Sequence, residues 1–450
     1  MKTKSINFLA ASLTVFVVTA IAQPAPFAGN GTRGYSGDGG AATSAQLNDV
    51  HAISGDVSGN IYILDGGNSD VRKVNPANII STVAGNQVAG FTGDGGIATA
   101  ASLSCYGGEI GLDGLGNLYI NDIYNARIRK VSTTGVITTL AGNGSIGYTG
   151  DGGAATAAAI TASSMAVDKL GNVYLADAGR NIIRKINAIG VINTIAGTGI
   201  AGYSGDGGLA INAQFSWPSY LAIDTAGNLF VSDVYNYAIR KINTAGVIST
   251  YAGNGTAGSS GDGGSAVSAK IMPGALAFNP NNELYFSTTS PSTYLTSLRK
   301  VDNAGIITTA KGSSYFIDLF NGFGGGIAPF YIDNTNAMYF VIWGGCGVAR
   351  DPGTIYKMSL GELEKPKPIE NPKLVEQINL ITPNDDGKDD QTLISGEMIE
   401  VFNRNGILVR TINGSGIWDG KDNMGTIVPM GYYVAICKET QKTTNITVVR

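Results

Sequence analysis

The clearest copy of a repeated unit opens with Gly202-Tyr203-Ser204-Gly205-Asp206-Gly207-Gly208 and runs to Gly253. After this opening loop come four short apolar or alternating runs, separated by Gly, Asn or Asp: residues 221–224, 229–233, 238–242 and 247–253. Alternation over four to eight residues, bounded by turn formers, is typical of β-strands. The unit is therefore predicted to be a four-stranded antiparallel meander.

The opening loop returns along the chain at a nearly fixed interval. Its aspartate recurs with successive steps of 56, 57, 55 and 56 residues. The five positions are Asp38, Asp94, Asp151, Asp206 and Asp262. A single four-stranded sheet cannot bury both of its faces, so the copies are expected to pack on one another.

A sixth unit lacks its fourth strand. Residues 330–333, 337–341 and 354–358 supply three runs, and the loop aspartate is missing. Residues 23–31, at the other end of the chain, match the end of a unit, as comparison with residues 251–255 shows. A terminal strand that completes the last sheet closes a ring and leaves no free edge. We predict an all-β fold in which residues 23–360 form a six-bladed β-propeller closed by its N-terminal strand.

The repeated motif resembles the NHL repeat, a propeller family. One copy reads Asp113, Gly116-Asn117, Asp122, Asn125 and Arg127-Ile128-Arg129, and further copies lie at 168–184 and 224–240. The resemblance covers residues 23 to 360 and implies the propeller fold. Unit five departs from it at residues 279–283, which lack the Gly-Asn turn, and unit six lacks the Gly-Asp-Gly-Gly loop.

The first 22 residues have the pattern of a secretory signal peptide. Lys2 and Lys4 precede an apolar run at residues 8–20, and small residues precede Gln23. Cleavage is predicted after Ala22. The apolar run is shorter than the roughly 20 residues that a membrane span needs, and no later segment qualifies. We expect an exported protein, secreted or held at the outer cell surface, without a transmembrane span after signal removal.

Residues 361–377 mix charged residues with prolines, which is typical of a semi-extended linker. Residues 378–450 then form a separate module, for which alternation and turn signals predict a small β-sandwich. Its ordered motifs are at residues 382–390, 399–406, 418–420 and 429–433. They resemble the gliding motility-associated C-terminal domain, the type B sorting signal of the type IX secretion system in Bacteroidota. Asn405 and Asp385 depart from that pattern. The resemblance implies the type IX secretion machinery as a partner.

Composition excludes several functions. The net charge of −4 argues against a nucleic-acid partner. Three cysteines lie far apart and have no metal-ligand or disulfide spacing. The single histidine, His51, excludes mechanisms that need a histidine pair. No nucleophile triad, phosphate loop or paired-carboxylate motif is evident, so we expect a protein that is not an enzyme and carries no cofactor, apart from the calcium considered below.

The loop aspartates permit two interpretations. They could be ligands for calcium or a sugar, or each could cap a short Ala-rich turn by accepting backbone N–H groups. One carboxylate per loop makes a poor metal site, so the structural interpretation is favoured. The Ile-Arg-Lys runs that recur in the third strands are interpreted as alternation with solvated charge.

Function in a repeat fold is expected where the copies diverge. The divergent residues lie just before the first strand of each unit, where they would ring the mouth of the central channel. The candidates for ligand binding are His51, Tyr106, Glu109, Ser164, Trp217 and Tyr220. Such a mixture of aromatic and polar residues suits a carbohydrate or peptide. Neutral drift of a loop explains the divergence equally well.

A further candidate site lies in the C-terminal module. The loop 382–390 gathers four carboxylates and Asn384 around a glycine, and mutual repulsion among acidic groups favours a bound cation. Asn384, Asp386 and Asp390 are candidate calcium ligands, with a solvated turn as the alternative.

These observations favour a monomeric secreted or cell-surface binding module for a glycan, peptide or protein. A propeller lyase or lactonase that acts on an extracellular substrate is one alternative. A structural or adhesion protein without a discrete ligand is the other.

Overall fold

The computed structural model describes residues 24–289, 296–310, 327–342 and 353–360, together with seven strands between residues 379 and 448. The chain divides into two compact units, one of residues 18–367 and one that contains residues 368–450. The predicted signal peptide (1–22) and linker (361–377) lie outside the described residues, so they stay predictions. In the part of the chain that is described, no helix has the length and apolar character needed to cross a membrane.

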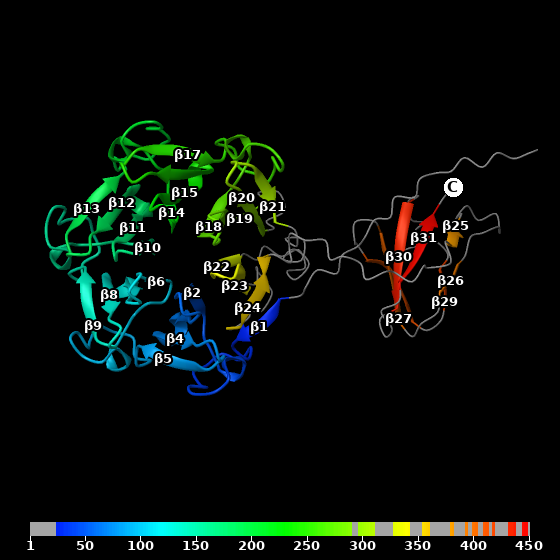
Figure 1. The fold of residues 1–450 in the computed structure, drawn as a ribbon, viewed down its shortest axis with the longest axis horizontal. Helices are drawn as coiled ribbons and strands as arrows, with labels where there is room; N and C mark the ends of the chain where they lie inside the picture. Colours follow the sequence, from blue (N-terminus) through cyan, green and yellow to red (C-terminus); the bar gives the residue numbers. More distant parts are fainter. Residues whose placement is uncertain are drawn as a thin grey trace, which may run out of the picture. The chain divides into compact units, whose positions relative to one another are not determined.

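The described residues of the first unit form a ring of six four-stranded sheets (Figure 1). Each sheet is an antiparallel meander, as the repeated pattern predicts. The first three blades are β2 (Val50–Gly55), β3 (Ile61–Asp65), β4 (Asp70–Val74), β5 (Ile80–Ala84); β6 (Ile110–Leu112), β7 (Leu118–Asp122), β8 (Arg127–Val131), β9 (Ile137–Ala141); and β10 (Ser164–Val167), β11 (Val173–Asp177), β12 (Ile182–Ile186), β13 (Ile192–Ala196). The next two are β14 (Pro218–Ile223), β15 (Leu229–Asp233), β16 (Ala238–Ile242), β17 (Ile248–Ala252); and β18 (Pro273–Phe278), β19 (Leu284–Thr289), β20 (Thr296–Val301), β21 (Ile307–Thr309).

The sixth blade joins the two ends of the propeller sequence. It consists of β22 (Ile327–Ile332), β23 (Ala337–Ile342), β24 (Ile355–Ser359) and the N-terminal β1 (Ala25–Ala28). Strand β1 pairs antiparallel with β24, with Ala25 opposite Lys357 and Ala28 opposite Ile355. The inner strands β22 and β2 are also in contact, which closes the circle. The prediction of a six-bladed propeller completed by its N-terminal strand is confirmed.

Apolar packing between neighbouring blades holds the ring together, because each sheet is covered on both faces by the blades beside it. Between blades three and four, Ile183 and Ala176 pack with Val231 and Leu229, all of them nearly or fully buried. Burial of one such aliphatic side chain stabilises the fold by about 1.5–3 kcal/mol. The core is thus a series of layers between neighbouring sheets.

Short 3-10 turns connect the strands. Five lie in the long loops that lead from one blade to the next: η1 (Ala42–Ser44), η3 (Ala98–Ala100), η5 (Ala155–Ala157), η7 (Ala210–Asn212) and η9 (Ala266–Ser268). Four follow the second strands: η2 (Gly66–Asn68), η4 (Ile123–Asn125), η6 (Ala178–Arg180) and η8 (Val234–Asn236). The first alanine of each loop turn is buried, and Ala210 N–H donates to Gly246 O of the next blade. Each loop is therefore fastened to the blade that it enters.

The C-terminal unit is also built of strands. A five-stranded sheet has the order β25-β31-β30-β27-β28, and β26 pairs with β29. The strands are β25 (Asn379–Ile381), β26 (Thr392–Ile394), β27 (Met398–Asn403), β28 (Leu408–Asn413), β29 (Gly416–Trp418), β30 (Gly431–Cys437) and β31 (Thr443–Val448). The all-β class is confirmed. The sandwich packing of these sheets stays a prediction, because the side chains of this unit lie outside the described residues.

Candidate functional site

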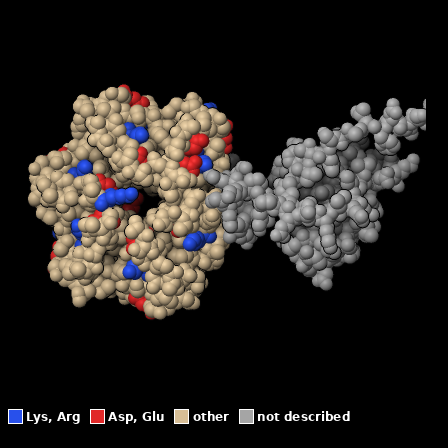
Figure 2. Space-filling view, viewed as in Figure 1, with Lys and Arg blue, Asp and Glu red and all other residues tan. Residues whose placement is uncertain are grey.

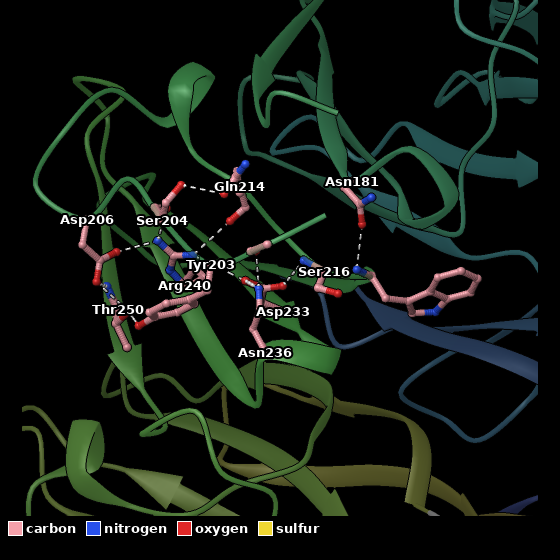
Figure 3. Close-up of polar contacts among 12 residues, drawn as sticks. Asn181, Tyr203, Ser204, Asp206, Gln214, Ser216, Asp233, Asn236, Arg240 and Thr250 are labelled. Atoms are coloured by element: carbon pink, nitrogen blue, oxygen red, sulfur yellow. Dashed lines mark hydrogen bonds and ion pairs between the residues drawn. The ribbon is translucent and has the colours of Figure 1, made fainter. Parts of the chain in front are cut away.

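The most prominent polar network in the propeller joins each loop aspartate to an arginine. Figure 3 shows the copy in blade four. In blade four, Arg240 Nη2 donates to Asp206 Oδ1 at 2.5 Å and to Ser204 O at 3.1 Å. The second oxygen of Asp206 accepts from Thr250 N at 3.0 Å and from Thr250 Oγ1 at 2.7 Å. Arg240 also reaches Asp233 Oδ2 at 3.4 Å, and its guanidinium lies 4.7 Å from the Tyr203 ring centroid. The network ties the loop to strands β15, β16 and β17.

The same ion pair recurs in the first five blades. The distances between guanidinium nitrogen and carboxylate oxygen are 2.6 Å for Arg72–Asp38, 2.8 Å for Arg129–Asp94, 2.6 Å for Arg184–Asp151 and 2.5 Å for Arg299–Asp262. Burial opposes ionisation of Asp206, but hydrogen bonds from Thr250 and Arg240 outweigh it and hold the pKa of this carboxyl below its usual value. Asp38, Asp151 and Asp262 show the same lowering of the pKa, with the same balance of causes.

Two sequence predictions about these residues are wrong. The aspartates do not cap the Ala-rich turns, because the residues that precede those turns, such as Leu209 before η7, make no side-chain capping bond. The arginines are not solvated either, since Arg240 is 0% exposed. Instead, each carboxylate pairs with an arginine that is buried between its own blade and the loop that enters that blade. The described contacts of this network are internal to the fold, as expected of structural residues.

A cavity of about 500 Å³ lies where the inner strands converge. The space-filling view shows the ring hollowed at its centre (Figure 2). Every blade contributes to the lining, through residues on or directly before its inner strand. Representative lining residues, in blade order, are His51, Glu109, Ser163, Tyr220, Leu276 and Phe330.

The structure brings most of the predicted mouth residues together. His51, Glu109 and Tyr220 line the cavity. Ser164 is buried and donates to Glu109, and the Tyr106 ring lies edge-on to the His51 ring with centroids 4.4 Å apart. Five of the six candidates are therefore connected to one site.

Trp217 lies apart from them and is not among the described lining residues. Its φ is 62°, and its backbone N–H donates to Asn181 Oδ1 at 2.9 Å. Its indole is 46% exposed and packs against Tyr235 at a centroid distance of 5.7 Å. This left-handed backbone conformation is unusual for a bulky residue, and it accompanies a side chain outside the lining.

Sequence reasoning missed several lining residues, among them Leu276 and Phe330. Both are the fourth residue of an inner strand, β18 and β22. Once the first strand of a unit is known to be the inner strand, the same offset in each copy would have identified them.

Glu109 has a perturbed electrostatic environment in the cavity. Ser164 Oγ donates to its two oxygens at 3.2 and 3.0 Å, and Met165 N donates to Oε2. Burial raises the pKa of Glu109 to about 7, although these hydrogen bonds oppose the rise. Burial, followed by the charge of Glu109, raises the pKa of Tyr220. The Tyr220 side chain is thus within electrostatic reach of the Glu109 carboxylate.

His51 is held in place by its surroundings. A Cβ added to Gly66 would collide with the imidazole ring, so η2 packs directly against His51. The Tyr106 ring packs against the other side of the imidazole. The imidazole therefore has little freedom to turn away from the cavity.

In the described part of the chain, no group of three or more His, Cys, Asp and Glu side chains is placed to hold a metal ion. Asn384, Asp386 and Asp390 lie outside the described residues. Calcium in the C-terminal module stays a prediction.

Comparison with known families identifies the C-terminal module. Residues 375–448 match the family described as the CHU_C type IX secretion signal domain. The chain carries a type IX secretion signal domain. The sequence prediction of a sorting module is confirmed, and the secretion signal assigns this propeller to proteins that engage the type IX secretion machinery.

Other similarities are more distant. Human teneurin-1 is 27% identical over an alignment of 240 residues, and the match covers 46% of this chain and 8% of teneurin-1. A streptogramin B lyase structure is 12% identical, with a TM-score of 0.41, over 70% of this chain and 94% of that one. PorZ from Porphyromonas gingivalis, a surface component of the type IX secretion system, is 14% identical with a TM-score of 0.39, over 89% of this chain and 51% of PorZ. At these TM-scores, neither structure carries an argument about function.

Proposed function

We propose that this secreted propeller binds an extracellular ligand in its central cavity. The observation that carries the proposal is the cavity itself, about 500 Å³ in volume and lined by all six blades. Sites for small molecules or for short parts of larger ligands usually measure about 300–1,000 Å³ and combine apolar walls with a few polar groups.

The lining has this composition. Tyr220 and Phe330 supply aromatic surface, and His51 and Glu109 supply polar groups. An aromatic ring together with hydrogen-bonding groups suits a sugar residue or a peptide side chain. The proposed ligand is accordingly part of a glycan, a peptide or a protein outside the cell.

The proposal can be tested by screening the mature protein on glycan and peptide arrays and measuring the affinity of each hit by calorimetry. Tyr220→Ala should weaken binding by about 1–3 kcal/mol, as expected for a buried aromatic contact. Trp217→Ala is the matched control, because Trp217 is aromatic and belongs to the same blade but lies outside the described lining. Equal affinities of the wild type and Tyr220→Ala would contradict the proposal.

One observation favours an enzyme as the second candidate. Glu109 has a pKa of about 7 and lies near Tyr220, and perturbed carboxyl groups in cavities often act as general acids or bases. Incubation with polysaccharide and lactone substrates tests this lyase or lactonase alternative. Turnover by the wild type and its loss in Glu109→Gln, with binding retained, would favour the enzyme. Arrays and assays that give no ligand and no turnover would favour a structural or adhesion role.

Export follows a proposed two-step route. A signal peptide cleaved after Ala22 would take the chain across the inner membrane, and the C-terminal signal domain would then direct it through the type IX machinery. A monomer is the proposed oligomeric state, because each blade packs against its neighbours in the ring and leaves only short edge strands exposed.

A further inference from the structure

The charge of the cavity lining comes from one acidic residue. Among the described lining residues, Glu109 is the only carboxylate, and no lysine or arginine is present. The other titratable groups are His51 on β2 and Tyr220 on β14. The site therefore offers a negative charge without a fixed positive one.

The described partners of Glu109 are neutral. Ser164 Oγ contacts both carboxylate oxygens, and Met165 N contacts Oε2. These donors orient the carboxylate but do not neutralise its charge. A carboxylate can accept about four hydrogen bonds, so it has capacity for a further donor.

We propose that the cavity selects ligands that carry a primary ammonium group, with the Glu109 carboxylate as the counter-ion. This inference rests on the proposed binding function and names the chemistry of its ligand. An ammonium group brings three N–H donors and a positive charge, and charge-assisted hydrogen bonds are roughly twice as strong as neutral ones. The group could belong to an amino sugar or to a lysine side chain. An anionic ligand would instead face the Glu109 charge without a compensating cation in the described lining.

A purely structural role for Glu109 makes a different prediction. The carboxylate precedes β6 and contacts Ser164 and Met165 on β10, so it links two neighbouring blades. If that link were its whole role, Glu109→Gln would lower the melting temperature and leave ligand selectivity unchanged. The charge preference of the cavity separates the two roles.

The pH dependence of binding supplies a second readout. Because the pKa of Glu109 is about 7, ammonium binding should strengthen as the pH rises through 7 and the carboxylate ionises. Loss of a proton from His51 would act in the same direction, since an imidazolium repels the ligand. The raised pKa of Tyr220 keeps its hydroxyl neutral over this range. His51→Gln should retain the pH dependence if Glu109 causes it.

The experiment measures the affinities of two matched pairs of probes for the mature full-length protein at about pH 8, where a carboxyl with a pKa near 7 is ionised. The first pair is 6-amino-6-deoxy-D-glucose and D-glucose. The second is Nα-acetyl-lysine amide and its Nε-acetylated form. In at least one pair, the member with the ammonium group should bind about 10-fold more tightly than its counterpart. Glu109→Gln should abolish most of this difference. The pair that responds identifies the source of the amine.

The possible outcomes distinguish this inference from the proposed function. Equal or reversed affinities within both pairs overturn the inference. The inference is also overturned if none of the four probes binds while an array ligand does bind and loses affinity in Tyr220→Ala. Failure to find any ligand that depends on Tyr220 overturns the proposed function itself. If Glu109→Gln does not fold, the selectivity of the wild type and the pH profile of His51→Gln still test the inference.

Discussion

Replacement of Arg240 by methionine should destabilise the propeller strongly. The variant removes a guanidinium that is 0% exposed and donates to Asp206, Asp233, Ser204 O and Gln214 O. Asp233 is also 0% exposed, so its carboxylate would lose a buried counter-charge, although Asn236 and Ser216 N still donate to it at 2.8 and 2.7 Å. Removal of one partner from a buried ion pair costs about 3–5 kcal/mol. Because the Asp206 side chain is 43% exposed and can be hydrated, we expect about 3 kcal/mol.

Equilibrium urea unfolding, followed by tryptophan fluorescence and circular dichroism, measures this loss. Lys241→Met is the matched control, because it changes the next residue of β16, whose side chain is only partly buried. Its cost should stay near 0.5 kcal/mol, the value of a weak cation–π contact such as the one with Phe230. Adding Asp233→Asn to Arg240→Met should recover part of the loss, since no buried carboxylate then remains unpaired. A cost below about 1 kcal/mol for Arg240→Met would refute the reasoning, because a solvated arginine would give that result.

Three further predictions concern pH, ring closure and export. Burial, together with the charge of Asp65, raises the pKa of Asp70 to about 8. The folded state therefore holds this proton more tightly than the unfolded state, and the free energy of unfolding should fall as the pH rises from about 4 through 8. Asp70→Asn should flatten this fall in melting temperature, and an unchanged pH profile would contradict the assignment. Deletion of residues 23–31, which removes β1, should lower the melting temperature far more than removal of linker residues 366–372 does, whereas equal temperatures would argue against the closed ring. Deletion of residues 378–450 should leave a folded propeller in the periplasm, as cell fractionation would show, and normal levels at the surface or in the medium would contradict the assigned role of the signal domain.

The period of the repeat made the blade count predictable. Local runs identify strands, and the terminal residues 23–31 resemble the end of a unit closely enough to place β1 in blade six. The sorting module was recognisable because its motifs are short and ordered along the chain. Each of these features can be read within one segment or by comparing two segments.

The arginine network was not predictable in the same way. Ala238, Arg240 and Ile242 share one face of β16, and Ile239 and Lys241 share the other. The usual rule that alternation places polar residues in solvent fails here, because neighbouring blades cover both faces of the sheet. Asp206 and Arg240 are 34 residues apart, and only the folded loop brings them together.

The candidate site was predictable in part. Divergence among the copies identified His51, Glu109 and Tyr220, all of which line the cavity. Trp217 was included for the same reason. Its position depends on a left-handed backbone conformation and a hydrogen bond to Asn181, neither of which the sequence pattern predicts. Phe330 was missed because an apolar residue within a strand looks like ordinary core.

A crystal structure of the propeller bound to a ligand selected on the arrays would test the central claim most directly. The account predicts that the ligand occupies the cavity between the inner strands and contacts both Tyr220 and Glu109. A ligand seated on the exposed Trp217 and Tyr235 pair, or on the outer strands, with no contact to Tyr220 or Glu109, would contradict it.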